Sequence, residues 1–146
     1  MKKLLPLIIL LFAASVYAQT DCPAIKKGST GIVKISNINA DLATDPTCRK
    51  VSYTGTIARL NYIDIIPNVV VGITIRMSRD RKETILFGDD SLFDCFSEAD
   101  FGNWQNKLKK GAKVKVVAWV CEVDGNNELS MAEIEFLPVN KKKGLL

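Results

Sequence analysis

The feature that most constrains this chain is its first 18 residues, because they decide the redox state of every cysteine that follows. Two lysines come directly after Met1, residues 4–12 are apolar, and residues 16–18 (Val-Tyr-Ala) form a cleavage site. This combination is typical of a secretory signal peptide rather than of a folded element. We therefore expect residues 1–18 to be removed and the mature chain to be secreted or periplasmic, where disulfides form and persist.

The mature chain contains four cysteines with long spacings: Cys22, Cys48, Cys95 and Cys121. The absence of a Cys-x-x-Cys pair argues against thioredoxin-like redox chemistry and against a compact zinc site. Zinc would also have to bind without histidine, since the chain has none. In an exported protein this even number predicts two structural disulfides, with four buried thiols as the alternative. Spacing alone leaves the pairing open.

The length of the mature chain fits a single domain, and its net charge argues against strong binding to duplex DNA. Residues 19–146 are enough chain for one hydrophobic core. Loss of the two signal-peptide lysines lowers the formal charge from +4 to +2, because 18 basic residues then face 16 acidic ones. This is not the charge of a strong duplex DNA binder. The apolar run is shorter than the roughly 18 residues that a membrane span requires, and no other stretch approaches that length, so we expect no membrane span.

The mature chain changes character near residue 51. Residues 19–50 read as an N-terminal extension with one short strand at 31–35 and a polar loop at 36–47. Beyond it, apolar and β-branched residues alternate with a period of two, most clearly over 69–77, which is typical of strands with one face in the core. The pattern predicts strands at 51–62, 69–77, 83–88, 113–123 and 128–137, a polar hairpin tip at 78–82, a turn at 124–127 and a lysine-rich tail at 139–146.

One helix is predicted between the third and fourth of these strands. Ser97 is a good N-cap residue, and Asp100 follows it with the spacing of a capping box. Gly111 has the position of a C-cap glycine. An apolar stripe then faces one side of the helix and is expected to plug a core rather than to bind a cofactor: Phe101, Trp104 and Leu108.

The order of three strands, a helix and a two-stranded hairpin resembles an OB-fold, and three segments carry the resemblance: 55–57, 71–77 and 108–116. The last segment is similar to the helix exit and fourth strand of exported bacterial OB-fold proteins of the tRNA-anticodon-like type. The resemblance covers residues 51–137. It implies an all-β fold with one capping helix, in which residues 51–138 form a five-stranded OB-like Greek-key barrel with an N-terminal extension, stapled by disulfides.

The resemblance also implies how the cysteines pair. In an OB-like barrel the first and fourth strands run antiparallel, so the start of one lies beside the end of the other. Cys48 precedes the first strand and Cys121 ends the fourth, whereas Cys95 lies at the opposite end of the barrel. The expected bridges are therefore Cys48–Cys121 and Cys22–Cys95.

Catalysis is not expected. Without histidine, neither Ser-His nor Cys-His chemistry is available, and we find no strand motif of the micrococcal nuclease type. An acidic run could bind Ca²⁺ through oxygen ligands, but it lacks the alternation of an EF-hand loop and reads as a solvated loop followed by helix N-terminal charges. The run comprises Asp89, Asp90, Asp94, Glu98 and Asp100. We expect no enzyme activity, no cofactor and no metal.

Binding is the function that this fold favours, on the face formed by the second and third strands. The expected ligand-binding residues are Arg59, Arg76, Arg79, Arg81 and Lys82. Asp80 and Glu83 dilute this positive charge. The predicted ligand is a macromolecule or a small anion, with single-stranded nucleic acid and anionic glycan as the main classes.

Two observations leave other partners open. The predicted outward residues Val70, Gly72 and Thr74 include no aromatic ring for base stacking, and the rings elsewhere are expected to pack: Tyr53, Tyr62, Phe87 and Trp119. Trp119 also shares a predicted outward face with Lys113 and Lys115, a second possible partner surface. The alternative function is a protein–protein interaction module of the cell envelope, such as a stress factor or a secreted inhibitor.

Overall fold

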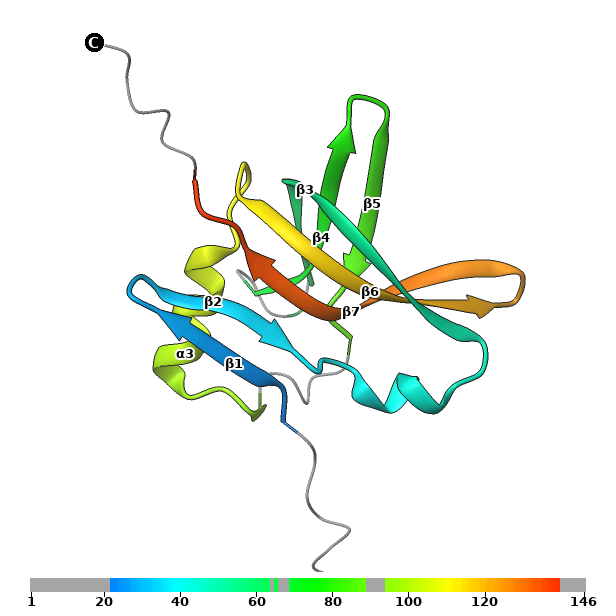
Figure 1. Cartoon of the computed structure of the whole chain (residues 1–146), viewed down its shortest axis with the longest axis horizontal. Helices are drawn as coiled ribbons and strands as arrows, with labels where there is room; N and C mark the ends of the chain where they lie inside the picture. The colour runs from blue at the N-terminus through cyan, green and yellow to red at the C-terminus, as the bar shows by residue number, and fades with distance from the viewer. Residues whose placement is uncertain (1–21, 64, 66–68, 89–93, 140–146) are drawn as a thin grey trace, which may run out of the picture.

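The computed structural model describes residues 22–63, 65, 69–88 and 94–139, and its strands join into one sheet (Figure 1). The elements are β1 (Ala24–Gly28), β2 (Gly31–Ser36), the short 3-10 helix η1 (Ala40–Thr44), β3 (Cys48–Tyr62), β4 (Val70–Ser78), β5 (Arg81–Leu86), α3 (Glu98–Lys107), β6 (Lys113–Val123) and β7 (Asn126–Phe136). The strands predicted for residues 51–137 are all present, and the ends of β6 agree with the prediction.

Strands β3 to β7 form a closed five-stranded barrel with one helix, as predicted for an OB-like fold. β3 pairs antiparallel with both β4 and β6, β4 with β5, and β6 with β7. A single parallel pair, Leu86 with Ser130, joins β5 to β7 and completes the ring. In Figure 1 the β4–β5 and β6–β7 hairpins project from this barrel in different directions.

Two glycines allow the chain to turn where the barrel requires it. Gly55 lies where β3 passes from pairing with β6 to pairing with β4, and a Cβ there would clash with the carbonyl oxygen of Arg76. The two strands can approach this closely only because the residue has no side chain. At the β6–β7 turn, Asp124 and Gly125 both have positive φ, 51° and 80°. The turn predicted at residues 124–127 is therefore present but shorter than predicted: Val123 pairs with Asn126, so only Asp124 and Gly125 form the turn and β7 begins at Asn126.

The N-terminal segment contributes more to the fold than a single short strand. It forms the hairpin β1–β2, and β2 pairs with β7 through Lys34 and Ile35. Ile32, Ile35 and Ile38 are buried in the same core as the barrel residues. The prediction of only one short strand missed β1, because its polar sequence Ala-Ile-Lys-Lys-Gly has little apolar alternation.

Asn39, in the polar loop, helps to close the barrel. Its side-chain amide donates hydrogen bonds to the carbonyl oxygens of Phe87 and Met131, both at 2.9 Å. Phe87 directly follows Leu86 and Met131 directly follows Ser130, the two residues of the single β5–β7 pair. The side chain therefore bridges strands where the backbone ladder is shortest. Asn39 adopts a left-handed conformation (φ 51°), which asparagine tolerates better than most residues.

Helix α3 closes one end of the barrel, as the apolar stripe predicts. Trp104 is fully buried, with its ring centroid 5.1 Å from that of Phe87 and 5.9 Å from that of Phe136. Leu108 is also buried. The predicted C-cap is wrong: the helix ends at Lys107 with Leu108 as its cap. Gly111 lies beyond the helix in a turn that needs its positive φ of 94°.

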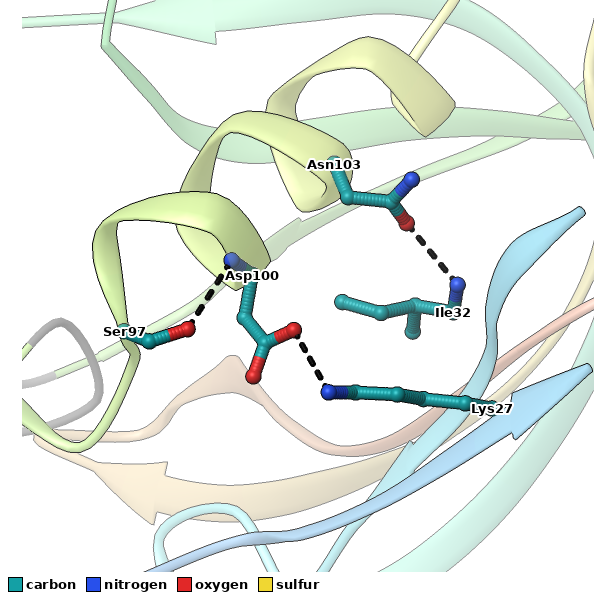
Figure 2. A network of polar contacts seen from close by, with 5 residues as sticks. All are labelled: Lys27, Ile32, Ser97, Asp100 and Asn103. Carbon is teal, nitrogen blue, oxygen red and sulfur yellow. Dashed lines mark hydrogen bonds and ion pairs between the residues drawn. The ribbon is translucent and has the colours of Figure 1, made fainter.

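Polar contacts fasten α3 to the β1–β2 hairpin (Figure 2). The Ser97 hydroxyl accepts a hydrogen bond from the Asp100 N–H at 3.1 Å, which confirms the predicted N-cap. The Asp100 carboxylate forms an ion pair with Lys27 at 2.8 Å. The Asn103 side-chain oxygen accepts a hydrogen bond from the Ile32 N–H at 2.8 Å. The pKa of Asp100 is lowered, because Lys27 and Ser97 stabilise the ionised carboxylate.

Both predicted disulfides are present. Cys48 is joined to Cys121, its direct partner in the β3–β6 ladder. Cys22 is joined to Cys95 and ties the start of the β1–β2 hairpin to the segment before α3. Two disulfides are typical of proteins that fold in an oxidising compartment.

Two predictions about outward-facing residues are wrong. Trp119 is only 7% exposed, because η1 covers this part of β6; the ring packs in a small second cluster with Cys121, Ala132 and Leu42. Its indole N–H donates to the Ile38 carbonyl oxygen at 3.4 Å. Val70 is also buried, at the start of β4, where the Gln105 side chain accepts a hydrogen bond from its N–H at 3.1 Å.

Three predicted features lie wholly or partly outside the described residues: the signal peptide, the lysine-rich tail beyond Val139, and Asp89 and Asp90 of the acidic run. Within the described ranges, no helix has the length and hydrophobicity needed to cross a bilayer.

Candidate anion-binding groove

An open groove of about 870 Å³ lies on the outer face of strands β3, β4 and β5. Its charged lining residues are all cations and come from four different segments: Arg59 from β3, Arg76 from β4, Lys82 from β5 and Lys110 from the loop before β6. The remaining lining residues are Thr56, Ile57, Ala58, Thr74, Thr84 and Gly111. No carboxylate is among these lining residues.

Strand register explains why these side chains meet. Arg59 pairs with Thr74, which in turn pairs with Thr84. Two residues further along β4, on the same face of the strand, Arg76 pairs with Thr56 of β3 and with Lys82 of β5. Paired residues of antiparallel strands project from the same face of the sheet. Two rows of side chains therefore cross the three strands, one of arginine and threonines and one in which Arg76 and Lys82 are direct neighbours.

The loop that carries Lys110 is held against β3 by backbone hydrogen bonds. The Gly111 N–H donates to the Ile57 carbonyl oxygen at 2.8 Å, and the Ile57 N–H donates to the Ala112 carbonyl oxygen at 2.9 Å. A further bond from the Ala112 N–H to the Lys109 carbonyl oxygen, at 3.0 Å, closes the turn. Lys110 is thus placed beside the groove by the backbone.

Lys110 was not among the predicted ligand-binding residues, since no local pattern shows which strand its loop contacts. The signal that could have placed it is the OB-like topology itself, in which the fourth strand begins beside the first. The Lys110 loop directly precedes that fourth strand.

The four groove cations are exposed, and none of them forms an ion pair with a described residue. Among the described residues, ion pairs join Lys27 to Asp100 and Lys34 to Glu133, and none of these four residues lines the groove. In the second pair the pKa of Lys34 is raised, because the Glu133 carboxylate accepts its hydrogen bond and stabilises the charged form. The groove cations have no such partner.

Hydroxyl groups form the second component of the groove. The Thr74 and Thr84 hydroxyl oxygens are 2.9 Å apart and hydrogen bonded to each other. The Asn61 amide donates to the Thr74 hydroxyl at 3.5 Å. The groove thus combines cations with neutral groups that can both donate and accept hydrogen bonds.

The structure brings together three of the five predicted ligand-binding residues: Arg59, Arg76 and Lys82. Arg79 and Arg81 lie at the tip of the β4–β5 hairpin and do not line the groove. Asp80 and Glu83, which were expected to dilute the charge, do not line it either.

The aromatic side chains around the barrel are mostly packed inside it. The prediction that these rings pack is confirmed for Phe87 and Trp119, which are buried, and for Tyr53, which is partly buried against the core. For Trp119 only the predicted outward orientation was wrong. Tyr62 is the exception, because it ends β3 and is 53% exposed. Tyr62 does not line the groove.

No group of three or more side chains of the types that ligate metals comes together within the described ranges. The chain matches no family model, no curated protein and no solved structure. The relation to exported proteins of the tRNA-anticodon-like type therefore stays a prediction, while the barrel topology stands on the strand pairing itself.

Proposed function

We propose that this protein is an exported, non-catalytic binding protein that holds an anionic ligand in the groove of β3, β4 and β5. The observation that carries the proposal is the convergence of four exposed cations from four segments, with no carboxylate among the residues that line the groove. Counterion release from the ligand would supply much of the affinity, as in other contacts between basic side chains and polyanions.

The pairing of Arg76 with Lys82 supports this proposal on energetic grounds. Like charges directly opposite each other in a sheet are destabilising, by some fraction of the 0.2–1 kcal/mol that a cross-strand pair is worth. Arg76, Lys82, Arg59 and Lys110 also lack a neutralising partner among the described residues. A bound anion would remove the repulsion, so the arrangement is favourable in a complex and unfavourable without one.

The composition of the groove favours binding over chemistry. Its side chains are arginine, lysine, threonine and small apolar residues, and none of these is a general base near neutral pH without a strongly lowered pKa. The two disulfides support an oxidising location, and together with the N-terminal pattern they favour the periplasm or the extracellular space.

The test compares two double variants that each remove one arginine and one lysine. Arg76→Ala with Lys82→Ala empties the centre of the groove, whereas Arg49→Ala with Lys26→Ala removes the same charge from exposed positions outside it. The probes are an oligothymidylate and a sulfated oligosaccharide, each measured by fluorescence anisotropy over a range of salt concentrations.

For the oligothymidylate, four phosphate contacts correspond to a slope of log affinity against log salt of about −3, which is roughly a 50-fold loss between 50 and 200 mM salt. We expect Arg76→Ala with Lys82→Ala to halve that slope and to leave thermal stability unchanged or slightly raised. The control variant should keep the wild-type slope. If both double variants weakened both probes equally, or if neither did, the groove would not be the binding site.

A third double variant separates the groove from the hairpin tip. Arg79→Ala with Arg81→Ala removes two cations that were predicted to bind but do not line the groove. We expect a smaller loss of affinity than for Arg76→Ala with Lys82→Ala. The reverse order would move the site to the tip of the hairpin.

The alternative, an envelope protein–protein module, has one observation in its favour. β5 pairs with β4 along its length but meets β7 only at Leu86, so the described backbone from Arg81 to Ile85 has a free edge. An extended peptide could add to such an edge. Salt separates the two functions, because strand addition through backbone hydrogen bonds should depend on salt much less than anion binding does.

A further inference from the structure

We infer that the groove selects an acidic oligosaccharide, whose sugars carry carboxylate or sulfate groups, over single-stranded nucleic acid. This inference rests on the proposed function and narrows it to one class of anion. Both classes satisfy the groove cations, so the choice depends on what the groove offers to the uncharged part of the ligand.

The groove offers nothing on which a base could stack. Proteins that bind single strands combine a basic track with aromatic rings, and each stacked base contributes about 1–3 kcal/mol. No aromatic residue lines this groove. Phe87 and Trp119 are buried, and the exposed ring of Tyr62 lies at the end of β3, outside the lining. A bound nucleic acid would keep its phosphate contacts and lose its stacking energy.

The groove does offer threonine hydroxyls beside the cations, and the amide of Asn61, which lies next to the groove rather than in its lining, extends them into a row. Asn61, Thr74 and Thr84 are linked by hydrogen bonds across β3, β4 and β5. Each threonine hydroxyl has one donor and two acceptor sites, so the row keeps unused capacity after these two bonds. Sugar hydroxyls are also both donors and acceptors, and they would extend the row without leaving a polar group unpaired.

A small apolar surface lies on the same outer face, beyond Thr74 and Thr84 and outside the groove lining. Gly72 pairs with Asn61 on one side and with Leu86 on the other. Leu86 is 51% exposed, and a Cβ at Gly72 would lie 2.9 Å from its side chain. The bare backbone at Gly72 therefore leaves room for Leu86 to lie over it. The C–H groups of a sugar ring could pack on this small apolar surface while its hydroxyls reach the threonine row and its acid groups reach the cations.

The experiment uses three labelled probes that carry the same number of negative charges: an oligogalacturonate, a sulfated neutral oligosaccharide and an oligothymidylate. Binding to the oxidised mature protein is measured at one low salt concentration. We expect at least one saccharide to bind tenfold or more tightly than the oligothymidylate, and the tighter of the two identifies carboxylate or sulfate as the preferred group.

A second experiment tests the hydroxyl row directly with a single variant. Thr84→Val keeps a β-branched side chain of similar volume but removes one hydroxyl. The saccharide should lose roughly threefold to tenfold in affinity, the range expected for one hydrogen bond, while oligothymidylate binding should not change. Thr54→Val, at an exposed position of β3 outside the groove, is the matched control and should change neither.

The outcomes separate this inference from the proposed function. Equal or tighter binding of oligothymidylate, with loss of binding in Arg76→Ala and Lys82→Ala, would overturn the saccharide preference and leave the anion site in place. The same holds if Thr84→Val weakened all three probes alike. If no probe bound the wild-type protein at low salt, both proposals would fail.

Discussion

The two disulfides form an unusually well-matched pair for testing what stabilises this fold. Each closes a separation of 73 residues. They also interleave symmetrically, since 26 residues separate Cys22 from Cys48 and 26 separate Cys95 from Cys121. Either bridge therefore restricts the unfolded chain to the same extent, whether or not the other is present. A difference between their contributions to stability must come from the native state.

The magnitude follows from the chain-entropy model. Closing a loop of this length removes about 15 cal/mol/K from the unfolded chain, or about 4.4 kcal/mol at 25 °C. Cys22→Ala with Cys95→Ala should lower the free energy of unfolding by an amount near this value. Cys48→Ala with Cys121→Ala should cost about 1 kcal/mol more, because Cys121 is 8% exposed and packs against Trp119 and Ala132.

The assay is urea unfolding under non-reducing conditions, followed by tryptophan fluorescence, for the wild-type protein and both double variants. Trp104 reports on the main core and Trp119 on the second cluster. Coincident transitions by fluorescence and circular dichroism would establish two-state unfolding. A loss below about 1 kcal/mol for one variant with a loss near 4 kcal/mol for the other would refute the reasoning, because symmetric loops cannot produce that difference.

Two further predictions concern the helix and the barrel. Asp100→Asn should lower the melting temperature near neutral pH and have little effect at low pH. Because the pKa of Asp100 is depressed in the folded protein, the carboxylate stabilises the fold above its ordinary pKa of 3.8, and this stabilisation is lost as the pH falls through the folded-state pKa. Equal effects at pH 7 and pH 2 would exclude the ion pair with Lys27 as the cause. Gly102→Ala, on the exposed side of α3 where a Cβ meets nothing within 4 Å, should stabilise the protein by about 0.5–1 kcal/mol. Gly55→Ala should instead destabilise it by about 1–3 kcal/mol, because its Cβ would clash with the Arg76 carbonyl oxygen. Urea unfolding of both variants checks the opposite signs.

The sequence predicts the barrel well because its strands follow local rules. The alternation over residues 69–77, the Asp-Gly turn and the Ser97 cap each act within a few residues, and each is present in the structure. The disulfide pairing was also predictable, although only through topology. β3 and β6 are antiparallel neighbours, and their register pairs Cys48 directly with Cys121.

The errors have a common physical origin in contacts between distant segments. Trp119 reads as an outward residue of β6, but Leu42 of η1 packs against its cluster and the Lys50 side chain lies over its ring. Val70 is buried because α3 covers the start of β4. Asn39 lies in a polar loop, yet its side chain joins two strands that are 48 and 92 residues away. No local pattern contains information about such contacts.

The same contacts leave the outer face of β3, β4 and β5 uncovered. Trp104 and Leu108 of α3 fill the end of the barrel, and the β1–β2 hairpin is fastened to that helix. η1 covers part of the outer side of β6. The β1–β2 hairpin and η1 thus cover the helix and part of β6 but leave the face with Arg59, Arg76 and Lys82 exposed. Like charges without a neutralising partner on an exposed sheet face are destabilising, and the anion that we propose for this groove would relieve that repulsion.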